Sequence, residues 1–182
     1  MLFDGVAAPL VYVRGDAISV IVPYAIAGHS STLVQVEYRD QLSTPMSISA
    51  EATAPGIFTD DSSGQGQAAA LNDDSTINSS TNPAARGSIV VLYGTGEGQT
   101  NPMGIDGKPA SAPLPSPLAP VSVKIGGQDA EVIYAGASAG LVAGVLQVNV
   151  RVPLSAATGA AVSVVLHAAD LSSPSSTTLA IR

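Results

Sequence analysis

Two pairs of adjacent aspartates, Asp60-Asp61 and Asp73-Asp74, lie near each other in the chain, with Asn72 and Asn78 beside the second pair. Calcium ions in proteins take six to eight oxygen ligands from carboxylates, amides and carbonyls. A Ca²⁺ or other divalent cation site is therefore one interpretation of residues 60–78, and metal-assisted hydrolysis is the reaction type it would support. The spacing does not match an EF-hand loop, so we favour a solvated acidic loop.

Other patterns that could do chemistry are weaker. The glycine-rich segment Thr95–Gln99 lacks the lysine and the following helix of a phosphate-binding loop. It is typical of a β-bulge or wide turn in which glycines take positive φ angles. The two histidines, His29 and His167, lie in corresponding regions of the two halves of the chain, which does not favour a shared metal site. A Gly-x-Ser-x-Gly nucleophile motif is absent, so acyl transfer is not indicated.

The tyrosines divide into two groups. Tyr12 and Tyr134 occupy equivalent positions of an internal repeat, and we expect them to be structural. Tyr24 and Tyr38 are the better candidates for ligand contact, for example in a carbohydrate-binding module. The chain has no tryptophan, the other residue that commonly stacks on sugars.

Composition limits the functions further. The net charge is −7 and the seven basic residues are scattered, which argues against nucleic acid as a partner. There is no cysteine, so disulfides and thiolate zinc sites are excluded. No apolar run approaches the ~20 residues of a membrane-spanning helix, and no signal peptide is expected at the start. Hydrophobic residues make up 46% and charged residues only 12%, which indicates an apolar, weakly charged surface.

These residues must be positioned by a repeated unit. The segment Phe3–Tyr12 resembles Ile125–Tyr134, with Gly5, Ala8 and Tyr12 matching Gly127, Ala130 and Tyr134. Each copy continues with a β-branched strand closed by a proline, Pro23 or Pro153, then a glycine and a further β-rich run. An internal repeat of this length usually means two copies of one structural unit.

Short alternating segments indicate an all-β chain, because none shows sustained helical periodicity. We expect strands at the following places: within 2–13, at Ile18–Val22, Leu33–Tyr38, Met46–Ala50, Gly87–Tyr93, Val121–Ile125, Glu131–Tyr134, Leu146–Val152, Ala161–Ala168 and Thr177–Ile181. Ala68–Leu71 is compatible with a strand or a helical turn. The second copy has a strand before its repeat and the first has none, so we expect an open edge with unpaired backbone and exposed apolar side chains there.

Several segments carry a family resemblance. They include Thr53–Thr59, Gly66–Asn72, Asn82–Ser88, Thr95–Thr100 and Gln147–Pro153. With them the chain resembles an uncharacterised C-terminal domain family abundant in Solibacter-like soil bacteria, and more broadly the immunoglobulin-like fold of the IPT/TIG type. The resemblance implies the end of a large secreted or cell-surface protein and assigns no catalytic residue. The chain departs from it by lacking the leading strand before the first hairpin.

The expected architecture is two Ig-like (IPT/TIG-like) β-sandwich modules, with a truncated first module at residues 1–56, a connecting segment at 57–86 and a second module at 87–182. The favoured function is non-catalytic: extracellular binding, adhesion or spacing. Expected partners are another extracellular protein, a glycan, or a second copy joined by strand exchange. A small metal-dependent hydrolase using the 60–78 loop and a carbohydrate-binding module are the alternatives.

Overall fold

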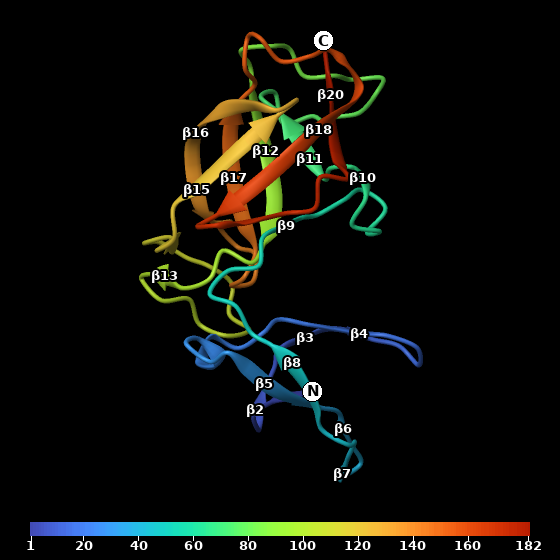
Figure 1. The fold of residues 1–182 in the computed structure, drawn as a ribbon, viewed down its shortest axis with the longest axis vertical. Helices are drawn as coiled ribbons and strands as arrows, with labels where there is room; N and C mark the ends of the chain where they lie inside the picture. The colour runs from blue at the N-terminus through green and yellow to red at the C-terminus, as the bar shows by residue number, and fades with distance from the viewer.

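The structure, a computed structural model, describes residues 1–182 and consists of β-strands, turns and one short 3₁₀ helix. The all-β class predicted from the sequence is therefore confirmed. Figure 1 shows a small body that contains the N-terminus and a larger body of curled strands that contains the C-terminus.

The N-terminal body is formed by residues 1–50. Its elements are β1 (Leu2–Phe3), β2 (Val6–Ala7), β3 (Leu10–Val13), β4 (Ile18–Val20), η1 (Tyr24–Ile26), β5 (Ser31–Gln35), β6 (Glu37–Tyr38), β7 (Gln41–Leu42) and β8 (Met46–Ser49). Four strands form a sheet in the order β2-β1-β5-β8, while β3–β4 and β6–β7 are separate hairpins. Its core is small, since only Phe3, Ala8 and Ile26 form a buried cluster.

The C-terminal body is larger and better packed. Its elements are β9 (Gly56–Ile57), β10 (Gly66–Gln67), β11 (Ala70–Asn72), β12 (Ile89–Thr95), β13 (Thr100–Asn101), β14 (Ser116–Pro117), β15 (Val121–Ile125), β16 (Gln128–Ala137), β17 (Leu146–Arg151), β18 (Gly159–Ala168), β19 (Leu171–Ser172) and β20 (Thr177–Ile181). The main sheet has the order β10-β20-β18-β15-β16-β17-β12-β11. One cluster of 18 buried residues, mostly valine, leucine, isoleucine and alanine, fills it.

One polar segment joins the two ends of this curled sheet. β9 and β11 both pair with β12, whereas β10 pairs with β20, and Thr59 bridges Ala68 between them. Residues 57–86 therefore add Ile57, Ala68, Ala70 and Ala84 to the core of the C-terminal body. The module boundaries expected at residues 56 and 87 stay a prediction.

The two bodies share a pairing scheme. β1 pairs with β5 as β15 pairs with β18, so that Phe3 lies opposite Val34 and Ile125 opposite Val164. β5 pairs with β8 as β18 pairs with β20. The strands that pair in the same way are those that the internal repeat of the sequence matches.

The β3–β4 hairpin repeats the β16–β17 pair with the same irregularity. Tyr12 lies opposite Ser19 and Tyr134 opposite Asn149. The register shifts between Leu10 and Tyr12 in one body and between Val132 and Tyr134 in the other, so a β-bulge occurs at the same place in both.

The bodies differ at one edge. In the C-terminal body β17 pairs with β16 on one side and with β12 on the other. In the N-terminal body β4, the equivalent of β17, pairs with β3 alone. The outer edge of β4 is thus unpaired.

Candidate functional site

The acidic residues lie in tight turns of the C-terminal body. The Asp61 carboxylate accepts hydrogen bonds from Ser63 N at 3.0 Å and Thr59 Oγ1 at 3.2 Å, and its bonds to Ser63, followed by that to Thr59, lower the pKa of Asp61. Asp74 accepts a bond from Thr76 N at 3.0 Å and its pKa is lowered by its bonds to Thr76. Asp60 and Asp73 are exposed. Nowhere in the chain do three or more histidine, aspartate or glutamate side chains come together to hold a metal ion.

The asparagines that the sequence suggested as amide ligands are buried. The Asn78 side chain is fully buried; its Nδ2 donates to Ala180 O at 2.9 Å and to Asn72 Oδ1 at 3.0 Å. Its Oδ1 accepts a bond from Ala180 N at 2.9 Å and another from Gln67 Nε2 at 3.0 Å. Asn78 thus binds the backbone of β20, and its polar atoms are used for structure rather than for a ligand. Sequence reasoning missed this role, because an asparagine in a polar loop gives no sign of burial.

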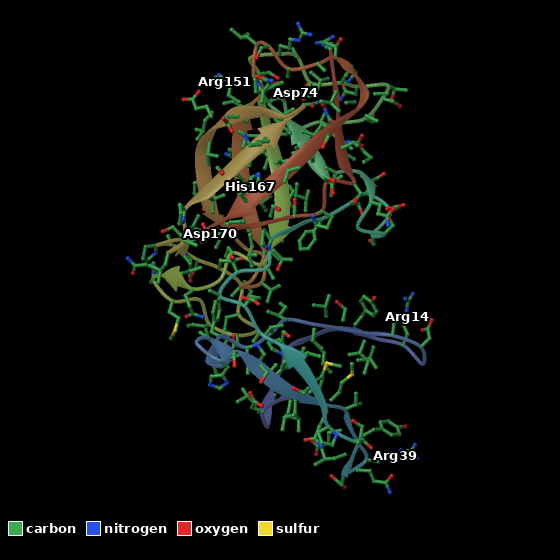
Figure 2. All side chains as sticks on the ribbon, viewed as in Figure 1. Arg14, Arg39, Asp74, Arg151, His167 and Asp170 are labelled. Atoms are coloured by element: carbon green, nitrogen blue, oxygen red, sulfur yellow. The ribbon has the colours of Figure 1, made fainter.

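The two candidate ligand-binding tyrosines have different surroundings. Tyr38 is 67% exposed at the tip of the β6–β7 hairpin, with the Arg39 guanidinium 5.2 Å from its ring centre. Figure 2 shows Arg39 at the far end of this hairpin. Tyr24 is half-buried between the two bodies, where its backbone N donates to Asp106 Oδ1 at 3.1 Å. Burial, followed by the negative charges of Glu97 and Asp106, raises the pKa of the Tyr24 hydroxyl.

The glycine-rich segment is a crossing point of two backbones. Gly96 and Gly98 have φ angles of 81° and 77°, as expected for glycine at a bulge or wide turn. A Cβ atom at Gly96 would lie 1.8 Å from Ala54 O, and one at Gly98 would lie 2.3 Å from Ala52 O. Only glycine therefore allows the chain between the bodies to pass over this segment.

Between these glycines lies Glu97, which is only 4% exposed. Burial raises the pKa of its carboxyl group, and no side chain donates a hydrogen bond to it. The sequence offered no signal for this burial beyond the glycines on either side. A buried carboxyl group at the junction of the bodies makes the stability of the chain depend on pH.

Exposed apolar side chains are concentrated in the N-terminal body. Eleven large ones are between 37% and 67% exposed: Val6, Leu10, Val11, Tyr12, Val13, Val22, Leu33, Tyr38, Leu42, Met46 and Ile48. A comparison with the equivalent positions of the C-terminal body identifies which of these exposed side chains occupy positions that face the core there. Val22 corresponds to the fully buried Val152 and Ile48 to the fully buried Leu179, while Leu10 corresponds to the partly buried Val132.

We call Leu10, Val13, Val22 and Ile48 the open face. Figure 1 shows that the β3–β4 and β6–β7 hairpins extend from the N-terminal body on the same side, and Figure 2 shows Arg14 at the tip of the first. In the C-terminal body, the equivalents of this face belong to, or pack against, one buried cluster to which β12 and residues 57–72 also contribute. The N-terminal body has no such cover within residues 1–182.

Two surface hollows of the C-terminal body are lined without an acid–base pair. One is lined by Leu114, Tyr134, Ala137, Ala139, Gln147 and Asn149. Within this lining Gln147 Nε2 donates to Asn149 Oδ1 at 3.0 Å, and Gln147 Oε1 also accepts a bond from the adjacent Ser138 Oγ at 3.1 Å. The other is lined by Ile57, Phe58, Thr59, Ser62 and Gly64.

Comparison of the chain with protein-family models, curated proteins and solved structures finds no match. None of the helical segments has the length and apolar character needed to span a membrane. The assignment of function therefore depends on the geometry of the chain itself.

Proposed function

We propose that this chain is a non-catalytic binding module composed of two Ig-like β-sandwich modules, the first of them open. In this proposal it belongs to a large secreted or cell-surface bacterial protein of the Solibacter-type C-terminal domain family. The observation that carries the proposal is the open face: side chains whose equivalents are buried in the C-terminal body are exposed in the N-terminal body. Large exposed apolar patches commonly mark sites of protein association.

The repeated pairing scheme supports the two-module description. The same strands pair in the same register in both bodies, including the bulge before Tyr12 and Tyr134. Each body also has its own buried cluster. One module fold used twice explains both observations, because each copy builds its own core.

The arrangement of polar residues supports a binding rather than a catalytic function. The carboxylates of Asp61 and Asp74 are bonded within their own turns, Asn78 is bonded to Ala180 of β20, and Asn72 is bonded to Asn78. The partner proposed for the open face is another polypeptide, and strand exchange with a second copy of the chain is one form of such binding.

A dye and an activity panel test the proposal together. An environment-sensitive apolar dye such as bis-ANS is expected to bind the chain, and Val22→Asp with Ile48→Asp is expected to reduce its fluorescence several-fold. Leu42→Asp, an exposed apolar position outside the open face, is the matched control. Ester, phosphate and glycoside substrates are expected to give no turnover with Ca²⁺, Mg²⁺ or Zn²⁺ present. Turnover that is lost on chelation and in the Asp60, Asp61, Asp73 and Asp74→Ala variant would instead establish the hydrolase.

A further inference from the structure

We infer that the outer edge of β4 binds a β-strand of a polypeptide other than a second copy of this chain, antiparallel to β4 and with apolar residues at alternate positions. This inference rests on the proposed function and specifies how the open face is covered. Addition of a strand to an exposed sheet edge is a common mode of peptide recognition: backbone hydrogen bonds supply affinity and alternate side chains supply specificity.

The C-terminal body provides the template for this pairing. There β12 runs antiparallel to β17, with Ile89 opposite Arg151 and Gly94 opposite Leu146. Because Pro153 corresponds to Pro23, these two β17 residues correspond to Ile21 and Asp16 of the N-terminal body. A bound strand in the same register would thus lie opposite residues 16–21.

The backbone groups needed for this pairing point outward from β4. Ile21 N donates to Pro9 O at 3.0 Å and Ala17 O accepts from Arg14 N at 2.8 Å, so these residues bond on the β3 side. Bonding direction alternates along a strand, so the N–H and C=O groups of Ile18, Val20 and Val22 point to the opposite side.

Val22 shows the unused bonding capacity most directly. Its equivalent, Val152, accepts a bond from Gly87 N at 2.8 Å and donates one to Ser88 O at 2.9 Å. Val22 itself makes no backbone hydrogen bond within the chain. A strand laid along β4 would supply the two missing partners.

The side chains of the template specify the chemistry of the bound strand. Along β12 burial alternates, and Val90 and Leu92 point into the core opposite Val150 and Val148. The corresponding residues of the N-terminal body are Val20 and Ile18. The strand that fits must therefore present valine- or leucine-sized side chains two residues apart, opposite Val20 and Ile18.

The apolar side chains available to a bound strand lie close to the unpaired edge. The open-face residues Leu10, Val13, Val22 and Ile48 are between 37% and 59% exposed. The unpaired edge and three of these residues, Leu10, Val13 and Val22, lie on the β3–β4 hairpin or directly after it. Both are covered together in the C-terminal body by β12.

A peptide taken from the chain itself is the sharpest probe. The segment Ser88–Gly94, flanked by lysines for solubility and labelled with fluorescein, is titrated with the full chain and followed by anisotropy. We expect saturable binding, and at least tenfold weaker binding of a control peptide in which the Val90 and Leu92 positions carry serine. Hydrogen exchange is expected to slow at the amides of Ile18, Val20 and Val22 when the first peptide binds.

Variants of the chain localise the contact. Val22→Asp is expected to weaken peptide binding at least tenfold, and the equally exposed Leu42→Asp is expected to leave it unchanged. Equal binding of the two peptides, or equal effects of the two variants, would overturn the inference. A dimer of the chain that protects the same three amides and excludes the peptide would also overturn it, because β4 of a second copy would then be the occupant. If bis-ANS still binds the open face while the peptide does not bind, strand addition to β4 is excluded and the proposed binding function is not.

Discussion

Val22 and Val152 occupy equivalent positions after equivalent strands, yet Val152 is fully buried and Val22 is 54% exposed. Each valine is followed by a proline, Pro23 or Pro153, and these two prolines match each other in the internal repeat. The difference arises because Val152 pairs with Gly87 and Ser88, just before β12, and nothing within the chain pairs with Val22. The same local sequence thus yields a core residue in one body and a surface residue in the other.

The first prediction compares truncation at these two positions. Val152→Ala is expected to lower the free energy of unfolding of the C-terminal body by about 2 kcal/mol, since it removes buried methyl groups from a packed core. Val22→Ala is expected to change stability by less than about 0.5 kcal/mol. Urea unfolding followed by circular dichroism measures both. Equal losses of unfolding free energy in the two variants would contradict the prediction and would show that Val22 is covered in solution.

The second prediction concerns the buried asparagine. Asn78→Ala is expected to cost about 2–4 kcal/mol, because Ala180 N would lose its Asn78 acceptor inside the core and Ala180 O would keep only the bond from Ala84 N. Ser80→Ala, at an exposed position of the same loop, is the control. Thermal unfolding of the two variants is the measurement. A small loss in Asn78→Ala would mean that water replaces the side chain.

The positions of most strands could be predicted from the sequence because alternation and β-branched residues are local signals. The patterns at Leu33–Tyr38 and Leu146–Val152 predict strands, and β5, β6 and β17 cover most of these residues. The pattern at Ala68–Leu71 is compatible with a strand or a helical turn, and the structure has β10 directly before this segment and β11 from Ala70 onward. β4 pairs with β3 alone, whereas its equivalent β17 pairs with both β16 and β12.

The roles of Asn78 and Glu97 could not be predicted in the same way. Asn78 contacts Ala180, which is 102 residues away, and Glu97 is buried because the chain at Ala52 and Ala54 crosses its neighbours Gly98 and Gly96. Long-range contacts of this kind leave no periodic pattern. The cation site proposed for Asp60, Asp61, Asp73 and Asp74 rested on proximity in sequence, and short-range hydrogen bonds within each turn compete for the same oxygens.

The third prediction concerns calcium. Millimolar Ca²⁺ is expected to leave the midpoint of thermal unfolding unchanged, because a ligand that binds only the folded state would raise it and no cluster of three acidic side chains is assembled to bind one. Differential scanning fluorimetry with and without EDTA is sufficient. A rise with Ca²⁺ that disappears in Asp73→Ala with Asp74→Ala would instead identify the cation site.

The fourth prediction separates the two tyrosines as ligand contacts. Tyr38→Ala is expected to leave stability unchanged, since its ring is exposed, whereas Tyr24→Ala is expected to destabilise the contact between the bodies. A glycan array probed with wild type and Tyr38→Ala then tests sugar binding without a change of fold. Signals that are present in wild type and lost in Tyr38→Ala would favour the carbohydrate-binding alternative.

The fifth prediction follows from the buried carboxyl group of Glu97. Its pKa is higher in the folded than in the unfolded chain, so the folded state holds the proton more tightly. This contribution to stability is complete below the unfolded pKa and is lost as the pH rises through the folded pKa. Glu97→Gln keeps the shape of the side chain and removes the charge. The variant is therefore expected to be more stable than wild type at pH 7, by on the order of 1 kcal/mol, and to show a flatter dependence of stability on pH.

Urea unfolding at several values between pH 4 and pH 8 measures this dependence. Glu51→Gln, an exposed carboxyl group in the segment between the bodies, is the matched control and is expected to follow wild type. A Glu97→Gln variant that is less stable than wild type at pH 7 would contradict the prediction. It would show that the charged carboxylate is held by a favourable interaction, and that the junction between the bodies requires the negative charge.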